Sequence, residues 1–413
     1  MLYSIIILLL SVIMVIYVLL VQKHGKYVVV FAILINVIPF FYLEHQDMNG
    51  TRFLSVPISY IPFLFASLFI IIKNKFLILE SDKIFAFWSI VFIIYITFTS
   101  FLNGFMLSTM VYVCSYALNF ILYLTTKNYY SKMLDSDHIL KIMVYTLFLV
   151  SIVGIFKYII GITNDTNFMP FLNRNATIIF IITIVPILFY IKEKNLIGKN
   201  IYFIINITFI ILIIYMYSRS AILALILIFF LYYYKLNIKF LFSLIIIFIV
   251  FIILIYSGLL DKQLIRFNET LITINMLNSG VVEHVGDYKR IVLINAAIDI
   301  IKDNLFFGVG VGVDNYINAF SLSVDYYDSD KAVRAHNLYL TRLANFGLIG
   351  YIIFMSLMIS IYRQLLDYKT FKIAFIAVAF LMIFNEYILL PELWIIFGLY
   401  AGIAKQNKNK GEI

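Results

Sequence analysis

Long hydrophobic runs, separated by short polar connections, make up most of this chain. A helix needs about 17–25 mainly apolar residues to cross the hydrocarbon layer of a membrane. The runs are too continuous for the alternating pattern of a membrane β-barrel, so helices are the expected spanning elements. The last two runs form a short pair broken by Pro391, so the sequence predicts an all-α, polytopic membrane bundle of twelve or thirteen helices. The pattern places these spans at roughly 2–21, 27–43, 54–72, 84–102, 106–126, 139–162, 176–191, 201–217, 220–234, 240–258, 339–361, 371–388 and 391–404.

One long polar segment interrupts this pattern and divides the chain into three expected regions. Residues 1–256 form a bundle of ten spans, residues 257–335 form an outward-facing loop, and residues 336–413 contain the last spans and a tail. Within the loop, apolar residues at 291, 294, 298 and 301 follow helical spacing. This spacing predicts an amphipathic helix from Arg290 to about Asp303, lying on the membrane face.

The composition excludes a soluble globular fold. The chain is 63% hydrophobic and 13% charged, with a mean hydropathy of +1.01, so lipid is the solvent for most of it. The net charge of +9 would favour nucleic acid as a partner of a soluble protein, but here the basic residues lie mostly in short loops. Cys114 is the only cysteine, which excludes an intrachain disulfide and a cysteine-cluster metal site.

The distribution of lysine and arginine predicts the orientation in the membrane. Alternate loops, such as 73–83 and 192–199, carry the larger number of these residues and are expected on the cytoplasmic side. The 257–335 loop then faces the periplasm, and with thirteen spans the N-terminus lies outside and the tail inside. The stretch from Leu2 to Val21 lacks a basic start and a small-residue cleavage site, so we interpret it as a retained span.

Three residues combine suitable chemistry with an unusual position at the outward face. Arg219 lies in a very short turn between the eighth and ninth spans, and Arg290 opens the loop helix. A guanidinium group stays charged and binds phosphate well, although arginines at a membrane surface often only contact headgroups or water. His336 lies at the start of the eleventh span, and histidine can act as a base near neutral pH. A single histidine there is more often structural than catalytic, so the residues alone leave both interpretations open.

Other polar features favour structural roles. The Gly-Val-Gly-Val-Gly run at 308–312 lacks the Lys-Ser/Thr ending of a phosphate loop, so we expect a tight turn with close backbone approach. No two histidines have metal-ligand spacing, and no metal is expected. Three basic residues interrupt the predicted spans: Lys141, Lys157 and Arg342. We expect Lys141 to reach the cytoplasmic edge of the membrane. Lys157 and Arg342 lie nearer the outer face and either reach outward, which is the simpler interpretation, or line a cavity.

Four short motifs follow one another on the predicted outer side. They are Ser-Arg-Ser around Arg219, Arg290 before the loop helix, Asn-Leu-Phe-Phe-Gly-Val-Gly at 304–310, and Ala-His-Asn-Leu-Tyr-Leu at 335–340, followed by Phe-Gly-Leu-Ile-Gly at 346–350. Together they resemble the O-antigen polymerase and ligase superfamily, which contains Wzy-type polysaccharide polymerases and WaaL-type ligases. The Asn-rich entry to a span at 171–176 is also similar. The resemblance covers roughly residues 170–360, whereas the first five spans match only in being hydrophobic.

The resemblance implies an inverting, metal-independent glycosyl transfer without a cofactor, on the outer face of the bacterial inner membrane. The donor would be a glycan on undecaprenyl diphosphate. By matching position, Arg219 and Arg290 would hold the diphosphate and His336 would activate the acceptor hydroxyl. Further substrate-binding positions implied in this way are Arg174, Gly308, Gly310, Arg334, Asn337 and Tyr339.

Several functions are compatible with these residues. The first interpretation is a Wzy-type polymerase, which transfers the growing chain onto another lipid-linked repeat unit and would work with a chain-length regulator. A WaaL-type ligase, which transfers the glycan to lipid A–core, is the close alternative because the catalytic residues are shared. A flippase or transporter would need many charged residues along its spans, and this sequence has few. Nothing in the sequence favours a protein acceptor.

Overall fold

The computed structural model describes residues 42–46, 52–57, 82–104, 107–132, 136–159, 174–216, 218–233, 286–312, 315–316, 318–319 and 335–409. This part of the chain is predominantly helical, which confirms the prediction of an all-α, polytopic membrane bundle. The helices are α4 (Lys83–Leu102), α5 (Leu107–Tyr130), α6 (Ser136–Ile159), α7 (Arg174–Glu193), α8 (Lys199–Tyr215), α9 (Arg219–Tyr232), α12 (Gly286–Asp303), α14 (Leu338–Gln364), α15 (Lys369–Leu381), η3 (Tyr387–Leu389) and α16 (Pro391–Asn409).

A two-stranded hairpin accompanies the helices. Strand β1 (Tyr42–Gln46) pairs antiparallel with β2 (Arg52–Pro57), and Tyr42 lies opposite Pro57. The hairpin occupies the predicted connection between the second and third spans. Because β2 continues to Pro57, the predicted start of the third span at 54 is wrong.

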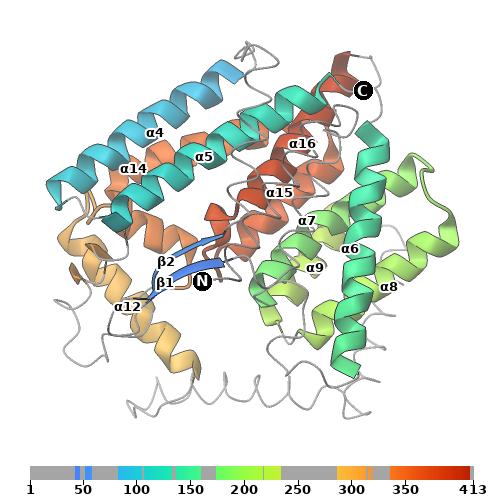
Figure 1. Cartoon of the computed structure of the whole chain (residues 1–413), viewed down its shortest axis with the longest axis horizontal. Helices are drawn as coiled ribbons and strands as arrows, with labels where there is room; N and C mark the ends of the chain where they lie inside the picture. Colours follow the sequence, from blue (N-terminus) through green and yellow to red (C-terminus); the bar gives the residue numbers. More distant parts are fainter. Residues whose placement is uncertain are drawn as a thin grey trace.

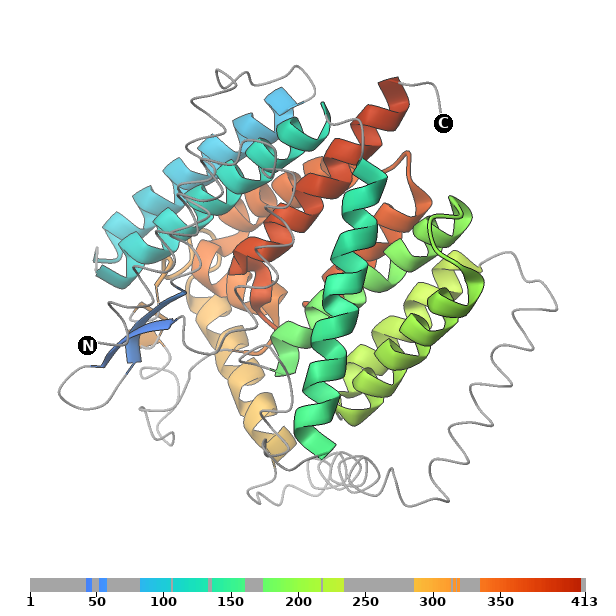
Figure 2. The same ribbon diagram turned by 45° about the vertical axis from the view of Figure 1, so that its right-hand side comes forward.

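The helices form two groups joined by α15 and α16. Figure 1 shows α4 and α5 side by side at one edge with α14 behind them, and α6 to α9 at the opposite edge. Figure 2 confirms this arrangement from a second direction and shows α12 below α14. Helix α16 packs closely on α5, because Gly398 and Gly402 lie against the carbonyl oxygens of Tyr123 and Lys127. Small residues allow such close helix packing in membranes.

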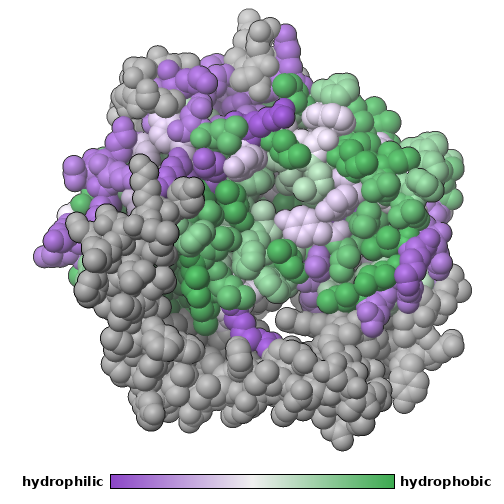
Figure 3. All heavy atoms as spheres, turned by 180° about the vertical axis from the view of Figure 1, so that it is seen from behind, coloured by the Kyte–Doolittle hydropathy of each residue, from purple (hydrophilic) through white to green (hydrophobic). Residues whose placement is uncertain are grey.

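Several of the described helices have the length and the exposed apolar side chains expected of membrane spans. Four of them are long and apolar enough to cross a bilayer: Lys83–Leu102, Thr109–Tyr130, Asp137–Phe156 and Leu338–Gln364. They coincide with the predicted spans at 84–102, 106–126, 139–162 and 339–361. Large apolar side chains such as Phe87, Ile94 and Phe98 point outward on α4, and Figure 3 shows such residues gathered over one face. A surface of this kind is covered by lipid rather than by water.

Several predicted spans differ from the helices observed. Helix α7 is buried along its length, from Thr177 to Ile191, so it is a central helix surrounded by others. Helices α8 and α9 are shorter apolar helices. The predicted span at 371–388 is too long, since α15 ends at Leu381 and a non-helical segment leads to η3. The predicted spans at 2–21, 27–43 and 240–258 lie almost entirely outside the described residues, so the total count stays a prediction.

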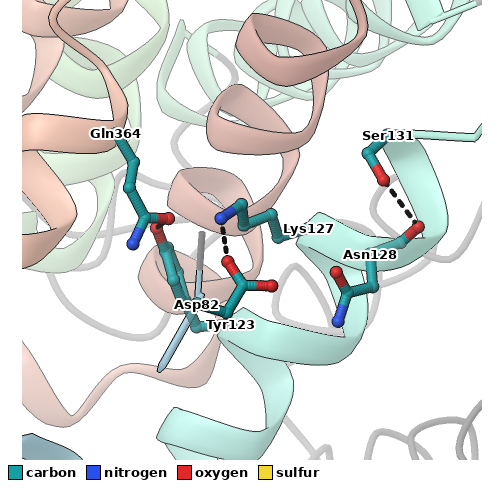
Figure 4. Close-up of polar contacts among 6 residues, drawn as sticks. All are labelled: Asp82, Tyr123, Lys127, Asn128, Ser131 and Gln364. Carbon is teal, nitrogen blue, oxygen red and sulfur yellow. Dashed lines mark hydrogen bonds and ion pairs between the residues drawn. The ribbon is translucent and has the colours of Figure 1, made fainter. Parts of the chain in front are cut away.

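A buried ion pair fixes one end of the bundle. Asp82, at the N-terminus of α4, accepts a hydrogen bond from Lys127 near the C-terminus of α5, and both side chains are almost fully buried (Figure 4). Beside it, the Tyr123 hydroxyl donates to the Gln364 side-chain oxygen at 2.7 Å, which brings in the last turn of α14. A buried charge needs such a partner. This end therefore contains the C-terminus of α14, opposite to the His336 end.

Candidate functional site

The site is built around the start of α14. Asn337 caps this helix, because its side-chain oxygen accepts hydrogen bonds from the backbone N–H groups of Tyr339 (3.0 Å) and Leu340 (3.1 Å). His336 precedes the cap with an exposed side chain and a left-handed backbone, φ +48°. The predicted position of His336 at a helix N-terminus is confirmed. The cap holds the imidazole at a fixed place outside the helix, in contact with solvent.

Arg219 lies at the same end of the bundle. Helix α9 begins at Arg219 after the cap residue Ser218, whose Oγ accepts from Ala221 N at 3.3 Å. At the other end of α9, Tyr232 O accepts a hydrogen bond from Lys369 at the start of α15, so the two helices run antiparallel. The end of α15 is bonded to the start of α14, where Leu338 N donates to Met382 O at 2.9 Å. The half-buried Arg219 therefore lies toward His336, and the predicted short turn before it is confirmed.

Helix α7 places Arg174 at this end too. The ring of Tyr190, near the end of α7, lies 5.3 Å from that of Phe371, near the start of α15. Helices α7 and α15 are therefore antiparallel, and the first residue of α7 lies with the C-terminus of α15. The side chain of Arg174 lies outside the described residues, and so does all of Arg334.

Helix α12 buries residues that the predicted apolar row does not include. Its predicted end at Asp303 is confirmed, but the buried side chains are Leu293, Ala296, Ala297 and Ile300, whereas Ile298 is exposed. In the predicted apolar row, Ile294 and Ile301 are half-buried and Ile301 packs against this cluster, whereas the side chain of Ile291 lies outside the described residues. The two alanines are buried because a small side chain allows the helix to approach α14 closely. On the outer side, Asp299 accepts a hydrogen bond from Lys302 at 2.8 Å, and this carboxylate raises the pKa of the exposed Lys302.

The packing of α12 also sets the direction in which it runs. The turn after α12 bonds to Ala344 and Asn345, in the middle of α14, while Leu293 belongs to the same buried cluster as Ala335, next to His336. The helix thus runs back along the first turns of α14. Its N-terminal turn, which contains Arg290, is directed toward the His336 end. The backbone of Arg290 is described, but its side chain is not.

The glycine run at 308–312 forms the predicted close-approach turn, and this turn packs against α14 at Gly347. Helix α14 is kinked at Gly347 (φ +63°, ψ −176°), and the 304–310 turn is inserted at this break. The backbone amides of Val309 and Gly310 donate to the carbonyls of Ala344 (3.0 Å) and Asn345 (2.9 Å). In return, Leu348 N donates to Leu305 O at 2.7 Å. The turn replaces the hydrogen bonds that the kink removes from α14.

Helix α4 and the start of α5 form hydrogen bonds to the inserted turn and to the kink of α14. The Tyr95 hydroxyl donates to Phe346 O at 2.7 Å, Ser100 Oγ accepts from Val311 N at 3.1 Å, and Thr109 donates to Val311 O at 2.7 Å. These are hydroxyl contacts to backbone groups within a membrane bundle. An added Cβ at Gly308 would lie under 3.0 Å from Gly347 N, and one at Gly310 would lie 3.1 Å from Ser100 Cα, so both glycines have a packing role. Substrate contact by either glycine stays a prediction.

Two further ionisable side chains lie at the first turns of α14: Arg342, which belongs to this helix, and Glu386, which contacts it. Thr341 donates a hydrogen bond to Glu386, which follows the end of α15. Arg342 is only 2% exposed, so the favoured interpretation that it reaches outward is wrong, and the alternative of an inward-facing side chain stays open. Its position inside a predicted span was the available signal, because an arginine in a spanning helix is rare unless it has a function. The side chain of Lys157 lies outside the described residues.

An apolar cavity of about 140 Å³ adjoins the same helix start. Tyr339 lies on its wall, and its hydroxyl donates to Ala379 O of α15 at 2.7 Å. That bond ties α14 to α15, so the hydroxyl is already engaged. The cavity lies between α14, α15 and α16 and is lined by Leu338, Tyr339, Phe354, Met355, Met358, Ile359, Ile361, Tyr362, Phe375, Val378, Ala379, Met382, Ile388, Leu393, Trp394 and Phe397.

The site therefore combines helix N-termini with cationic residues. The starts of α7, α9, α12 and α14 lie toward one end of the bundle, and the N-terminus of a helix carries a partial positive charge. Within the described ranges, no group of three or more His, Cys, Asp or Glu side chains is placed to hold a metal ion. The arrangement suits an anionic ligand, with a histidine at its edge. The fold defines the molecule as a polytopic helical membrane protein.

A comparison with known protein families gives a match to the part of the chain that contains most of the site. A family described as O-antigen ligase matches residues 204–355, and this match confirms the resemblance to the O-antigen polymerase and ligase superfamily. The matched region runs from α8 to α14 and contains Arg219, Arg290, the glycine turn and His336, whereas Arg174 precedes it. A search of curated proteins gives no match. The family match thus covers the starts of α9, α12 and α14, whereas the start of α7 lies before it.

Proposed function

We propose that this protein transfers a glycan from a polyprenyl diphosphate carrier to a sugar hydroxyl at the outer face of the bacterial inner membrane. The family match indicates a function of the O-antigen ligase or polymerase type, carried out by membrane enzymes that transfer glycosyl groups. The observation that carries the finer proposal is the convergence of four helix N-termini with Arg219 and His336 at one end. A diphosphate leaving group is anionic, and the arginine and the helix N-termini at this end are positively charged.

The proposed reaction is a direct displacement. The acceptor hydroxyl oxygen attacks the anomeric carbon, the bond from that carbon to the phosphate oxygen breaks, and the configuration inverts. The hydroxyl proton passes to His336, and the polyprenyl diphosphate leaves with the bonding electrons. Arg219 and Arg290, together with the helix N-termini, neutralise the charge that develops on the leaving oxygen. Arg174, Arg334, Asn337 and Tyr339 complete the proposed binding site without a metal ion.

We favour a Wzy-type polymerase, in which the acceptor is another lipid-linked repeat unit and a chain-length regulator is a partner. The motifs at 304–310 and 335–340 support this choice. The specific observation in favour of a WaaL-type ligase is the family description, which names O-antigen ligase. The two functions share the donor and differ in the acceptor.

Deletion of the gene distinguishes these two functions. Loss of a polymerase is expected to leave lipid A–core that carries a single repeat unit, because ligation still proceeds. Loss of a ligase instead leaves uncapped core and glycan retained on the lipid carrier. A gel of surface glycans reads out both results. An unchanged glycan ladder would contradict both functions, and restoration by the wild-type gene is the control.

A further inference from the structure

A buried arginine in α14 forms no ion pair with an acidic side chain among the described residues. Arg342 is 2% exposed, although it lies within a membrane-spanning helix. Its guanidinium carbon lies 5.7 Å from the ring centroid of Tyr116 and 5.8 Å from that of Phe346. Its Nε has no hydrogen-bond partner, and no carboxylate of the described residues forms an ion pair with it. The two aromatic faces are therefore its main contacts.

This arrangement leaves the charge incompletely compensated. A guanidinium group removed from water normally requires an anion or several acceptors, because the cost of desolvation is large. Cation–π contact replaces part of the lost hydration but accepts no N–H hydrogen bond in the plane of the guanidinium. Glu386, which follows the end of α15, accepts a hydrogen bond from Thr341, the neighbour of Arg342 in α14, and forms no ion pair with Arg342. Arg342 consequently retains the capacity to bind an added anion.

The position of Arg342 relates it to the candidate site. It follows the cap residue Asn337 by five positions, a rise of about 7.5 Å along the helix. Side chains on an α-helix lean toward its N-terminus, so Arg342 is directed toward the His336 end. One turn further on, the buried Asn345 has a side-chain oxygen without a hydrogen-bond partner. Both unsatisfied groups lie on neighbouring positions of one helix face.

We propose that Arg342 is a further binding residue for the anionic substrate, and that it takes a phosphate of the lipid-linked diphosphate at the inner end of the site. The phosphate oxygens accept from the guanidinium N–H groups, and Asn345 accepts from a hydroxyl of the same ligand. This inference rests on the proposed function and adds an arginine of α14 to the proposed binding residues. Binding turns an uncompensated buried charge into a paired one.

Binding of geranylgeranyl diphosphate to the purified full-length protein in detergent tests this assignment. Arg342→Met removes the charge but keeps a long side chain, and we expect the affinity to fall about 10- to 100-fold. Without ligand, the variant is expected to unfold at the same temperature as the wild type or higher, because an uncompensated buried charge is removed. A purely structural arginine predicts the reverse pattern, with lower stability and unchanged affinity. Arg363→Met, at the exposed far end of the same helix, is the control and should change neither quantity.

Two added ligands identify the source of the phosphate. Geranylgeraniol has the lipid chain without the charge and is expected to bind equally to the wild type and to Arg342→Met. Inorganic pyrophosphate should bind more weakly than the prenyl diphosphate; equal affinity would show a site for free phosphate and overturn the lipid assignment. Equal binding of the prenyl diphosphate by wild type and Arg342→Met would overturn the role of Arg342. If Arg342→Met does not fold, Arg342→Lys tests the same point, since it keeps the charge and loses bidentate contact.

The proposed function can fail independently. If the wild type binds the prenyl diphosphate through Arg342 but transfers no glycan, the binding role of Arg342 is supported and the proposed glycan transfer is contradicted. If Arg342→Met transfers glycan as fast as the wild type at low donor concentration, the role of Arg342 fails while the proposed function stands.

Discussion

Replacement of His336 is expected to lower the rate of glycan transfer by about 10²- to 10⁴-fold, the usual contribution of a general base. The imidazole is exposed in front of the α14 cap, at the end where the starts of α9 and α12 lie. Its left-handed backbone, φ +48°, complicates the choice of variant, because alanine is strained there. Asparagine tolerates this conformation, so His336→Asn removes the base and keeps the backbone. The initial rate with a lipid-linked donor is the measurement.

The matched control for His336→Asn is His138→Asn. His138 is an exposed histidine in the first turn of α6, outside the region matched by the family. We expect it to leave the rate unchanged. A loss of less than tenfold in His336→Asn, in protein that unfolds at the wild-type temperature, would show that His336 is not the base.

Replacement of Gly347 by alanine is expected to lower the free energy of unfolding by about 3 kcal/mol or more. A Cβ at this position would lie under 3.0 Å from the backbone of Phe306 and Gly308, and the residue needs φ +63°. The inserted turn must then move away, which leaves the carbonyls of Ala344 and Asn345 without their N–H partners within the bundle. Thermal unfolding in detergent measures the effect, and the same reasoning applies to Gly308→Ala.

Two other glycines separate the causes of this loss. Gly104 has φ +88° but open space around it, so Gly104→Ala measures backbone strain alone and should cost about 1–2 kcal/mol. Gly198 has open space and no left-handed backbone, so Gly198→Ala should change little. If Gly347→Ala costs no more than Gly104→Ala, the close crossing of the turn and α14 does not stabilise the protein.

The sequence predicted local features of the site better than the contacts between distant segments. The starts of α9 and α14 at Arg219 and after Asn337, and the end of α12 at Asp303, follow from caps and hydrophobic spacing near these residues. The tight turn at 308–312 was predictable because glycine runs permit such backbones. That Gly347 is its partner was not, since hydrophobic periodicity treats 338–364 as one uninterrupted helix.

The buried side chains of α12 and the buried position of Arg342 also depend on contacts between distant segments, which the sequence does not show. Periodicity selected residues 291, 294, 298 and 301 of α12, but the side chains of α12 buried in the cluster shared with α14 are Leu293, Ala296, Ala297 and Ile300. Two of these four are small residues, which hydrophobic spacing does not select. Arg342 was expected to reach the surface because nothing along the sequence shows that Tyr116 and Phe346 enclose it. Such contacts depend on how α5 and α14 are placed in space.

Transfer by the purified protein, with a polyprenyl-diphosphate-linked oligosaccharide as the only glycan donor, tests the central claim most directly. We predict longer glycans with release of one polyprenyl diphosphate per transfer, without nucleotide sugar, unaffected by EDTA, and strongly reduced in Arg219→Ala and Arg290→Ala. Added lipid A–core as acceptor distinguishes a ligase in the same assay. No transfer to either acceptor, or full activity in both arginine variants, would contradict the proposal that this end of the bundle binds a diphosphate leaving group.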